Sequence, residues 1–441
     1  MIKPFIVIQG PVATRSGYGN HTRDLALSLI KSEKYNIQIV SLPWGVTPMN
    51  ALEADNVDHQ LIRGCIVTAN ITQQPDVFIQ ISVPNEFVRN GKYNIGITAG
   101  IETTIVSPEF IQGANKMDLI LTTSVHSKST FIASTYDAVD KQSNKKTGEL
   151  RLEKPIEILY EGVDINTYKK ITTIEPTVVN ELKDIPESFC YLFVGHWLKG
   201  DMGHDRKDIG MMLKTYCEAF KRKSSKNIPG LILKTSHATF SVIDRDMIYD
   251  RVHRILEPYG DKAPNVYLLH GDLSDNEMNS LYNHPKVKAM ISFTKGEGFG
   301  RPLAEFSMTG KPIIASDWSG HKDFLKHATL LPGQLNKVHD SAADNFILKD
   351  AQWFTVDYSY AASILQDVVS NYKKYLENSR KQPQYIKDNF SLEGMKSLFC
   401  EYVDSGLSSI PQQMSLQLPK LKKVGTSAPK LKLPKLKKIK L

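Results

Sequence analysis

The chain has 441 residues, of which 41% are hydrophobic and 23% are charged. This composition excludes a generally disordered or fibrous protein, and the length exceeds what one hydrophobic core supports, so we expect two globular domains. The formal net charge of +8 comes from residues 419–441, which hold nine lysines and no acidic residue. Residues 1–418 are close to neutral, which argues against a folded body that tracks nucleic acid along a basic surface.

Membrane-spanning and metal-binding classes are also disfavoured. No apolar run approaches the roughly 18–20 residues of a membrane helix, and the opening "MIKPFIVIQG" reads as a short strand without a signal-peptide cleavage region after it. We therefore expect a cytoplasmic protein, or one that is peripheral at a membrane surface. The four cysteines are far apart and form no CxxC pair, so we expect buried free thiols and no zinc site or disulfide.

Strands and helices alternate through the first half of the chain. Short runs rich in β-branched residues predict strands, and longer stretches with apolar residues at helical spacing predict helices. This alternation is typical of a parallel sheet covered by helices on both faces. The strands are predicted at 4–10, 35–43, 75–82, 93–99, 118–124 and within 155–168, and the helices at 18–33 and 126–134.

Two polar stretches, 137–155 and 168–187, separate the halves, and the first suits an exposed loop. Strand-and-helix alternation restarts after the second stretch. We therefore predict a first domain at 1–183, a second domain at 184–405 and a tail at 406–441.

The second half repeats the strand-and-helix alternation of the first. The fold class predicted is therefore α/β, with two facing Rossmann-like, doubly wound parallel-sheet domains. Such sheets bind ligands at the carboxyl ends of their strands, so two facing copies would form a cleft between the domains. The strands are predicted at 190–195, 231–236, 266–271, 287–293 and 312–316, and the helices at 209–223, 246–260, 275–284 and 302–310.

The tail repeats the motifs PKLKK and PKLKL. Its prolines prevent a long helix and its lysines repel one another, so an extended segment is expected. Two interpretations remain open for it. The tail is either a solvated extension or a segment that docks on an acidic surface of a membrane, a nucleic acid or a protein.

The stretch "KGEGFGRPLAEF" combines two glycines, a helix start and two glutamates. Gly298 and Gly300 allow the backbone to approach a ligand, and Pro302 is favoured in the first turn of a helix, whose free N–H groups suit a diphosphate. Glu305 would then face a pair of hydroxyls such as those of a ribose, and Glu297 the hydroxyls of a sugar. The alternative is a surface turn with two solvated acids.

The spacing of Glu297 and Glu305, followed by "GKPIIASDWSGHKDFL", resembles the Glu-x7-Glu signature of retaining GT-B glycosyltransferases of the glycosyltransferase family 4 type. The resemblance covers roughly residues 5–405 and is strongest from 265 to 325. "ILYEGVD" resembles the turn that closes the first domain of this family, with Glu161 in place of asparagine. The resemblance implies a nucleotide-diphosphate-sugar donor, a glycan, lipid or protein acceptor, no cofactor and no essential metal.

The resemblance also implies roles for the residues of the glycine-rich loop. Glu297 would contact the donor sugar and Glu305 the ribose of the nucleotide. The other donor-binding candidates of this loop are Gly298, Phe299, Gly300 and Arg301.

A basic pair of the family neutralises the diphosphate leaving group. Lys207, in "DRKD", matches its lysine, but His196 stands where the family has an arginine. Arg206, Lys199 or a protonated His196 could supply the second charge. A structural loop histidine is the alternative role for His196.

Further candidates lie in the first domain. Gly17 and Gly19, in "SGYGNH", fit a glycine loop facing the donor phosphates, or a plain strand-to-helix turn. Glu102 stands in the region where the family often has a histidine. His126 follows a strand and is a candidate for the acceptor side, or simply a histidine at a helix start.

Other functions remain open. The basic tail would suit a nucleic-acid-associated or DNA-modifying protein. A non-catalytic sugar-nucleotide-binding protein would fit the departures at His196 and Glu161. Epimerases and phosphorylases share the fold, although a phosphorylase would need a longer chain and a pyridoxal lysine. No DxD motif follows a strand in the expected context, because Asp244 and Asp246, in "SVIDRDMIYD", read as helical and solvated.

Overall fold

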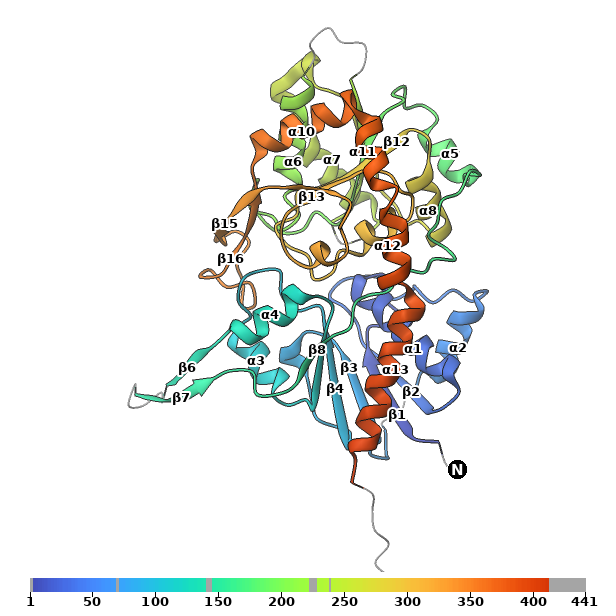
Figure 1. The fold of residues 1–441 in the computed structure, drawn as a ribbon, viewed down its shortest axis with the longest axis vertical. Helices are drawn as coiled ribbons and strands as arrows, with labels where there is room; N and C mark the ends of the chain where they lie inside the picture. The colour runs from blue at the N-terminus through green and yellow to red at the C-terminus, as the bar shows by residue number, and fades with distance from the viewer. Residues whose placement is uncertain (1–2, 69–70, 140–144, 222–227, 238, 412–441) are drawn as a thin grey trace, which may run out of the picture.

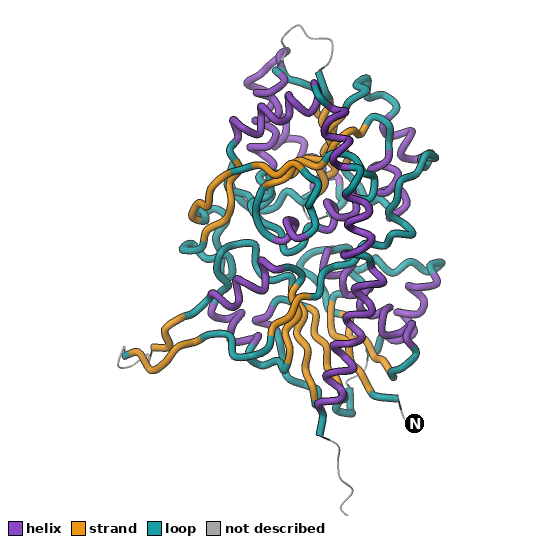
Figure 2. Tube along the Cα trace, in the orientation of Figure 1, coloured by secondary structure: helices purple, strands orange, loops and turns teal. Residues whose placement is uncertain are grey.

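A computed structural model describes residues 3–68, 71–139, 145–221, 228–237 and 239–411. The described chain forms two α/β halves stacked along the long axis of the molecule, and helices flank the strand layer of each half (Figures 1 and 2). The predicted tail lies outside the described residues except for its first six, 406–411.

The first sheet has six parallel strands in the order β2-β1-β3-β4-β5-β8. Every strand predicted in the first half is confirmed, and β3 is buried along its whole length, as expected for a sheet covered on both faces. The strands are β1 (Phe5–Gly10), β2 (Asn36–Ser41), β3 (Val77–Ile81), β4 (Tyr93–Thr98), β5 (Leu119–Thr122) and β8 (Ile156–Ile158). The helices are α1 (Gly17–Ser32), α2 (Val57–Cys65), η1 (Pro84–Glu86), α3 (Pro108–Ala114) and α4 (Val125–Ala133).

The second sheet also has six parallel strands, in the order β11-β10-β9-β12-β13-β14. The predicted fold class is therefore confirmed. The strands are β9 (Cys190–Val194), β10 (Gly230–Lys234), β11 (Val266–Leu269), β12 (Val287–Ser292), β13 (Ile313–Ser316) and β14 (Thr329–Leu331). The helices are α6 (Ile209–Phe220), α7 (Val242–Leu256), η2 (Glu257–Lys262), α8 (Asp275–Asn283), α9 (Arg301–Ser307), η3 (Gly320–Asp323), α10 (Tyr358–Ser370), α11 (Tyr372–Ser379) and α12 (Gln382–Asn389).

The polar stretches between the halves contain structure that the sequence analysis did not predict. The stretch 137–155, expected to be a loop, holds most of an antiparallel hairpin of β6 (Tyr136–Val139) and β7 (Lys146–Leu150), which projects from the first domain in Figure 1. The second stretch contains α5 (Pro176–Leu182), which buries Val178 and Leu182 in the hydrophobic core of the second domain. A further hairpin pairs β15 (Gly333–Lys337) with β16 (Gln352–Val356).

The last described helix, α13 (Leu392–Ser409), follows the second domain in sequence but packs on the first domain beside α1 (Figure 1). Met395, Phe399 and Val403 join the core that contains Leu25 and Leu29 of α1. Burial of each large apolar side chain contributes about 1.5–3 kcal/mol, which fixes the helix there. Residues 392–405, which the predicted boundaries assign to the second domain, thus complete the core of the first.

The four cysteines are free thiols. Cys190 and Cys217 are buried, as predicted, whereas Cys65 and Cys400 are only half-buried. Within the described part of the chain, no helix combines the length and apolar character that crossing a bilayer requires.

Candidate functional site

The glycine-rich loop connects the carboxyl end of β12 to α9 and faces the first domain. Gly300 precedes the helix with φ of 101°, a left-handed conformation that favours glycine. A Cβ atom on Gly298 would lie 2.8 Å from the Ala99 carbonyl oxygen, and one on Gly296 would lie 2.4 Å from that of Glu102. The glycines are therefore required for the direct contact of this loop with the first domain.

Glu297 is buried between two cations. Lys207 Nζ forms an ion pair with its Oε1, and Arg206 Nη1 lies 3.3 Å from its Oε2. Burial opposes ionisation of Glu297, but Lys207 and Arg206 outweigh this effect and lower its pKa to about 2. Arg206 Nη1 also lies 3.1 Å from Glu102 Oε1, across the domain boundary.

Lys295, which the sequence analysis did not single out, holds this cation pair in place. Its backbone N–H donates to the Arg206 carbonyl oxygen at 2.7 Å. Its side chain is buried, and its Nζ lies 3.3 Å from Asp208 Oδ2, which also accepts from the Tyr358 hydroxyl at 2.6 Å. Its position at the start of the glycine-rich loop, two residues after the predicted strand 287–293, is the sequence signal that could have revealed it.

Glu305 is buried one helical turn into α9. Arg301 Nε donates to its Oε1 at 3.0 Å and the Tyr282 hydroxyl to its Oε2 at 3.2 Å. Burial raises the pKa of Glu305 to about 7, although Arg301 opposes the shift. Arg301 also crosses to the first domain, where its Nη1 lies 2.7 Å from Asp24 Oδ2 and 3.9 Å from Glu161 Oε2.

Both glutamates of the loop are thus buried, which excludes the interpretation of a surface turn with two solvated acids. These contacts form two neighbouring networks, one around Glu297 and one around Arg301, and each joins acids and cations of both domains. We call the two networks together the junction cluster. It consists of Asp24, Glu102, Glu161, Arg206, Lys207, Glu297, Arg301 and Glu305.

His196 lies beside the junction cluster but is not a strong cation. The surrounding protein desolvates the ring, and the positive charges of Lys207 and Lys234 lie nearby. Both effects lower the pKa of His196, so the ring is neutral near pH 7. Its Nδ1 lies 3.1 Å from Ser236 Oγ. Lys199 donates to the Ala343 carbonyl oxygen at 3.0 Å instead. Of the three candidates for the second charge, Arg206 is the one that contacts Glu297.

The surroundings of Phe299 and Gly19 indicate a structural role, whereas those of Gly17 do not. The Phe299 side chain is buried in the second core, 4.9 Å from the ring of Phe324, so only its backbone faces the loop. Gly19 donates its N–H to Ser16 Oγ at 2.9 Å, and a Cβ there would lie 2.3 Å from the Thr14 carbonyl oxygen. Gly17, in contrast, has open space around its Cβ position.

The acceptor-side candidates meet near Trp318. The ring of His126 lies 5.0 Å from the Trp318 ring, and the indole N–H points to the Glu102 carbonyl oxygen at 3.5 Å. Burial lowers the pKa of His126 to about 4. His21, which the sequence analysis did not single out, is buried with neither ring nitrogen hydrogen-bonded, and burial lowers its pKa to about 3. It lies in the motif "SGYGNH", one turn of α1 before Asp24.

No three His, Cys, Asp or Glu side chains within the described residues are arranged to hold a metal ion.

Comparison with known proteins gives a fold and no sequence family. No family model matches the chain, and no curated protein matches its sequence. Among solved structures, Anabaena Alr3699/HepE in complex with UDP-glucose superposes with a TM-score of 0.57 at 13% identity, covering 91% of this chain and all of that one.

Two further solved structures superpose over the same extent. A glycosyltransferase from Rickettsia africae has a TM-score of 0.56 at 13% identity and covers 92% of this chain and 99% of its own. Sucrose-phosphate synthase from Thermosynechococcus elongatus has a TM-score of 0.61 at 10% identity, and the match covers 92% of this chain and 100% of the synthase chain. The fold shared with these proteins is GT-B, with two Rossmann-like domains.

Proposed function

We propose that this protein is a retaining glycosyltransferase that moves a sugar from a nucleotide-diphosphate donor to an acceptor without an essential metal. The observation that carries the proposal is the buried contact of Lys207 and Arg206 with Glu297 at the junction of two Rossmann-like domains. Two fixed cations at the carboxyl end of a parallel sheet suit a diphosphate.

The donor class rests on the chemistry of the loop and on one structural neighbour. UDP-glucose is bound to the Anabaena protein of the same fold, so it is the first donor to test. In the proposed complex Glu297 contacts hydroxyls of the sugar, and Glu305 accepts hydrogen bonds from the ribose. In the structure, Arg301 Nε donates a hydrogen bond to Glu305. The ribose must therefore bind Glu305 beside Arg301 or displace the Arg301 side chain from it.

The cation pair supplies the main catalytic effect. As the bond between the anomeric carbon and the phosphate oxygen breaks, negative charge develops on the leaving diphosphate. Arg206 and Lys207 stabilise this charge, which is the role that a metal ion has in other transferases. Without donor, Glu297 and Glu102 balance the two cations, so the site stays preorganised without a buried unpaired charge.

Retention is proposed because the spacing of Glu297 and Glu305 resembles the signature of retaining GT-B glycosyltransferases. We propose a front-face substitution, because the residues assigned to the site include no clear nucleophile. The acceptor oxygen attacks the anomeric carbon on the face that the phosphate leaves, and its proton passes to the departing phosphate oxygen. The bond that forms thus replaces the bond that breaks on the same face, and no residue needs to hold the proton.

Donor entry requires the two domains to separate. Gly298 lies against Ala99, and the Arg206–Glu102 and Arg301–Asp24 ion pairs join the domains directly. Separation breaks these ion pairs, and a bound donor would compensate for them through its own charges and hydroxyls.

A screen of nucleotide-sugars by thermal shift and by donor hydrolysis tests the proposal. We expect UDP-glucose or another nucleotide-sugar to stabilise the wild type, and Lys207→Ala and Glu305→Ala to abolish that shift. Lys373→Ala, on an exposed residue of α11, is the matched control and should behave as the wild type.

The outcomes separate the alternatives. Equal stabilisation of all four proteins would remove the assignment of the site. Stabilisation of the wild type with no donor hydrolysis and no transfer to any acceptor would favour a non-catalytic nucleotide-sugar-binding protein.

A further inference from the structure

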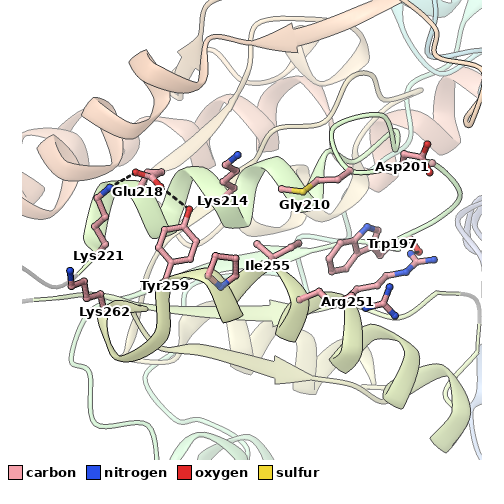
Figure 3. A pocket seen from close by; sticks show the side chains of 14 residues that line it. Trp197, Asp201, Gly210, Lys214, Glu218, Lys221, Arg251, Ile255, Tyr259 and Lys262 are labelled. Carbon is pink, nitrogen blue, oxygen red and sulfur yellow. Dashed lines mark hydrogen bonds and ion pairs between the residues drawn. The ribbon is translucent and has the colours of Figure 1, made fainter.

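A groove of about 1050 Å³ lies on the outer side of the second domain, between α6 and the continuous pair α7 and η2 (Figure 3). It is separate from the junction cluster and shares no lining residue with it. One wall carries Lys214 and Glu218, which lie one turn apart on one face of α6, and Lys221, which directly follows the helix. Its volume is that of a small-molecule site.

The lining is predominantly cationic. Lys214 and Lys221 face Arg251, Arg254 and Lys262 across the groove, and these five residues are half-exposed or exposed. Among the described residues, no ion pair or hydrogen bond involves the side chains of Lys214, Arg254 or Lys262. Like charges gathered in this way repel one another, and an anion between them would relieve the repulsion.

The acids in the groove do not neutralise this charge. Asp201 and Glu218 are the acidic lining residues. Glu218 accepts from Lys221 Nζ at 2.7 Å and from the Tyr259 hydroxyl at 2.8 Å (Figure 3). The groove therefore keeps an excess of positive charge.

The floor of the groove is apolar. Gly210 of α6 allows the Met202 side chain to lie on the helix, because a Cβ there would be 3.2 Å from Met202 Cγ. Ile255 of α7 lies beside the same glycine. At one end, the Arg251 guanidinium lies over the Trp197 ring, 5.6 Å from its centre. A ligand would thus meet an apolar surface between two rows of cations.

One loop connects the groove with the candidate active site. Residues 195–207 leave β9, contribute Trp197, Gly200, Asp201 and Met202 to the groove, and end at Arg206 and Lys207. The Arg251 guanidinium also faces the carbonyl oxygen of Trp197 at 3.4 Å. Arg251 therefore supports the loop 195–207 through Trp197, and a ligand bound to Arg251 would contact a residue that holds this loop in place.

We propose that the groove binds a compact ligand that carries two or more phosphate groups, at a site distinct from the donor cleft. The phosphates lie between Lys214 and Lys221 on one side and the basic residues of α7 and η2 on the other, and an apolar part of the ligand covers Met202 and Ile255. Phosphate is the anion that matches several convergent cations, and Arg254 can bind it with two parallel hydrogen bonds. This proposal does not depend on the proposed function.

Titration calorimetry with inorganic tripolyphosphate tests the site. The probe is added to the full chain, to the double variant Arg254→Glu/Lys262→Glu and to the control Lys373→Glu/Lys387→Glu, which makes the same charge change on exposed residues of α11 and α12. Lys207→Ala is added because tripolyphosphate could also bind at the junction cluster. Circular dichroism establishes that each variant is folded.

We expect the affinity of the groove variant to fall at least about ten-fold, since each charge-assisted contact to phosphate is strong, while the control keeps the wild-type value. Binding at the groove should persist in Lys207→Ala, whatever happens to binding at the junction cluster. Absence of binding to the wild type, or loss of binding only in Lys207→Ala, would overturn the proposal. A 12-nucleotide single strand and anionic vesicles form two further arms. Binding of either one without binding of tripolyphosphate would replace the small ligand by a polymer or a membrane surface.

Discussion

The molecule has two cationic regions that handle charge in opposite ways. In the junction cluster, Arg206, Lys207 and Arg301 are largely buried and each has an acid within 3.1 Å. In the groove, Arg254 and Lys262 are exposed. A buried cation is tolerated only when a partner is permanently present, whereas an exposed cation is solvated by water. Buried cations that are held in position for a reaction therefore need acidic partners in the protein. Exposed cations that only bind a ligand do not need them.

Arg301→Ala should have the largest effect on stability. The substitution leaves the buried Glu161 and Glu305 and the half-buried Asp24 without the guanidinium, and breaking a buried ion pair costs about 3–5 kcal/mol. Chemical denaturation measures the loss in the free energy of unfolding. The matched change Arg254→Ala in the groove should cost less than about 0.5 kcal/mol. Similar losses in both variants would contradict the contrast between the two regions.

Lys207→Ala should reduce sugar transfer roughly 100- to 1,000-fold, since it removes a fixed cation from the leaving group. The measurement is kcat with the donor identified by the screen. Lys207→Arg, which keeps the charge, should recover part of the rate. If Lys207→Arg is as inactive as Lys207→Ala, the effect arises from loss of structure and not from loss of charge.

Glu161→Gln should change the pH dependence of stability. Burial raises the pKa of Glu161 from 4.5 to about 7, although Arg301 opposes the shift. The folded protein therefore binds more protons than the unfolded chain between these pH values. The resulting stabilisation is complete below pH 4.5 and is lost as the pH rises through about 7. Glutamine does not ionise, so the variant should gain up to about 3 kcal/mol relative to the wild type over this range.

This gain is measured by urea denaturation at pH 5 and pH 8. A difference between variant and wild type that is the same at both pH values would show that Glu161 is ionised throughout.

The groove variant Arg254→Glu/Lys262→Glu should have the smallest effect on stability, within about 0.5 kcal/mol of the wild type, because both side chains are exposed. Thermal unfolding in low and moderate salt measures it. A large loss would mean that these cations have structural partners, and the distinction between the two regions would fail.

Much of the fold could be predicted from local sequence. Runs such as residues 190–194 and 287–292 are short, apolar and bounded by polar segments, so local sequence predicts them as strands. The edge strand β14 and the strands of the two hairpins lack this pattern and are not predicted. The glutamate pair around Gly298 and Gly300 was also predictable, since strand, glycine turn and Pro302 leave one local geometry.

Contacts between distant segments could not be predicted in this way. Asp24 and Arg301 are 277 residues apart, and no local pattern relates them. Asp24 reads as an ordinary polar residue of an amphipathic helix. The sequence offers His196 as a cation, but its pKa depends on desolvation by the surrounding protein and on Lys207 and Lys234, all of which only the fold defines. The apolar periodicity of α13 predicts a helix with a buried face, but it does not show that this face packs on the first domain.

That path has a consequence for how the chain is made. Leu25 and Leu29 are synthesised early, but Met395, Phe399 and Val403, which cover them, come only after the whole second domain. The nascent first domain therefore exposes an apolar face for most of translation and cannot reach its final state by itself. A fragment that ends at residue 183 should aggregate, and its solubility should return when a peptide of residues 390–411 is supplied.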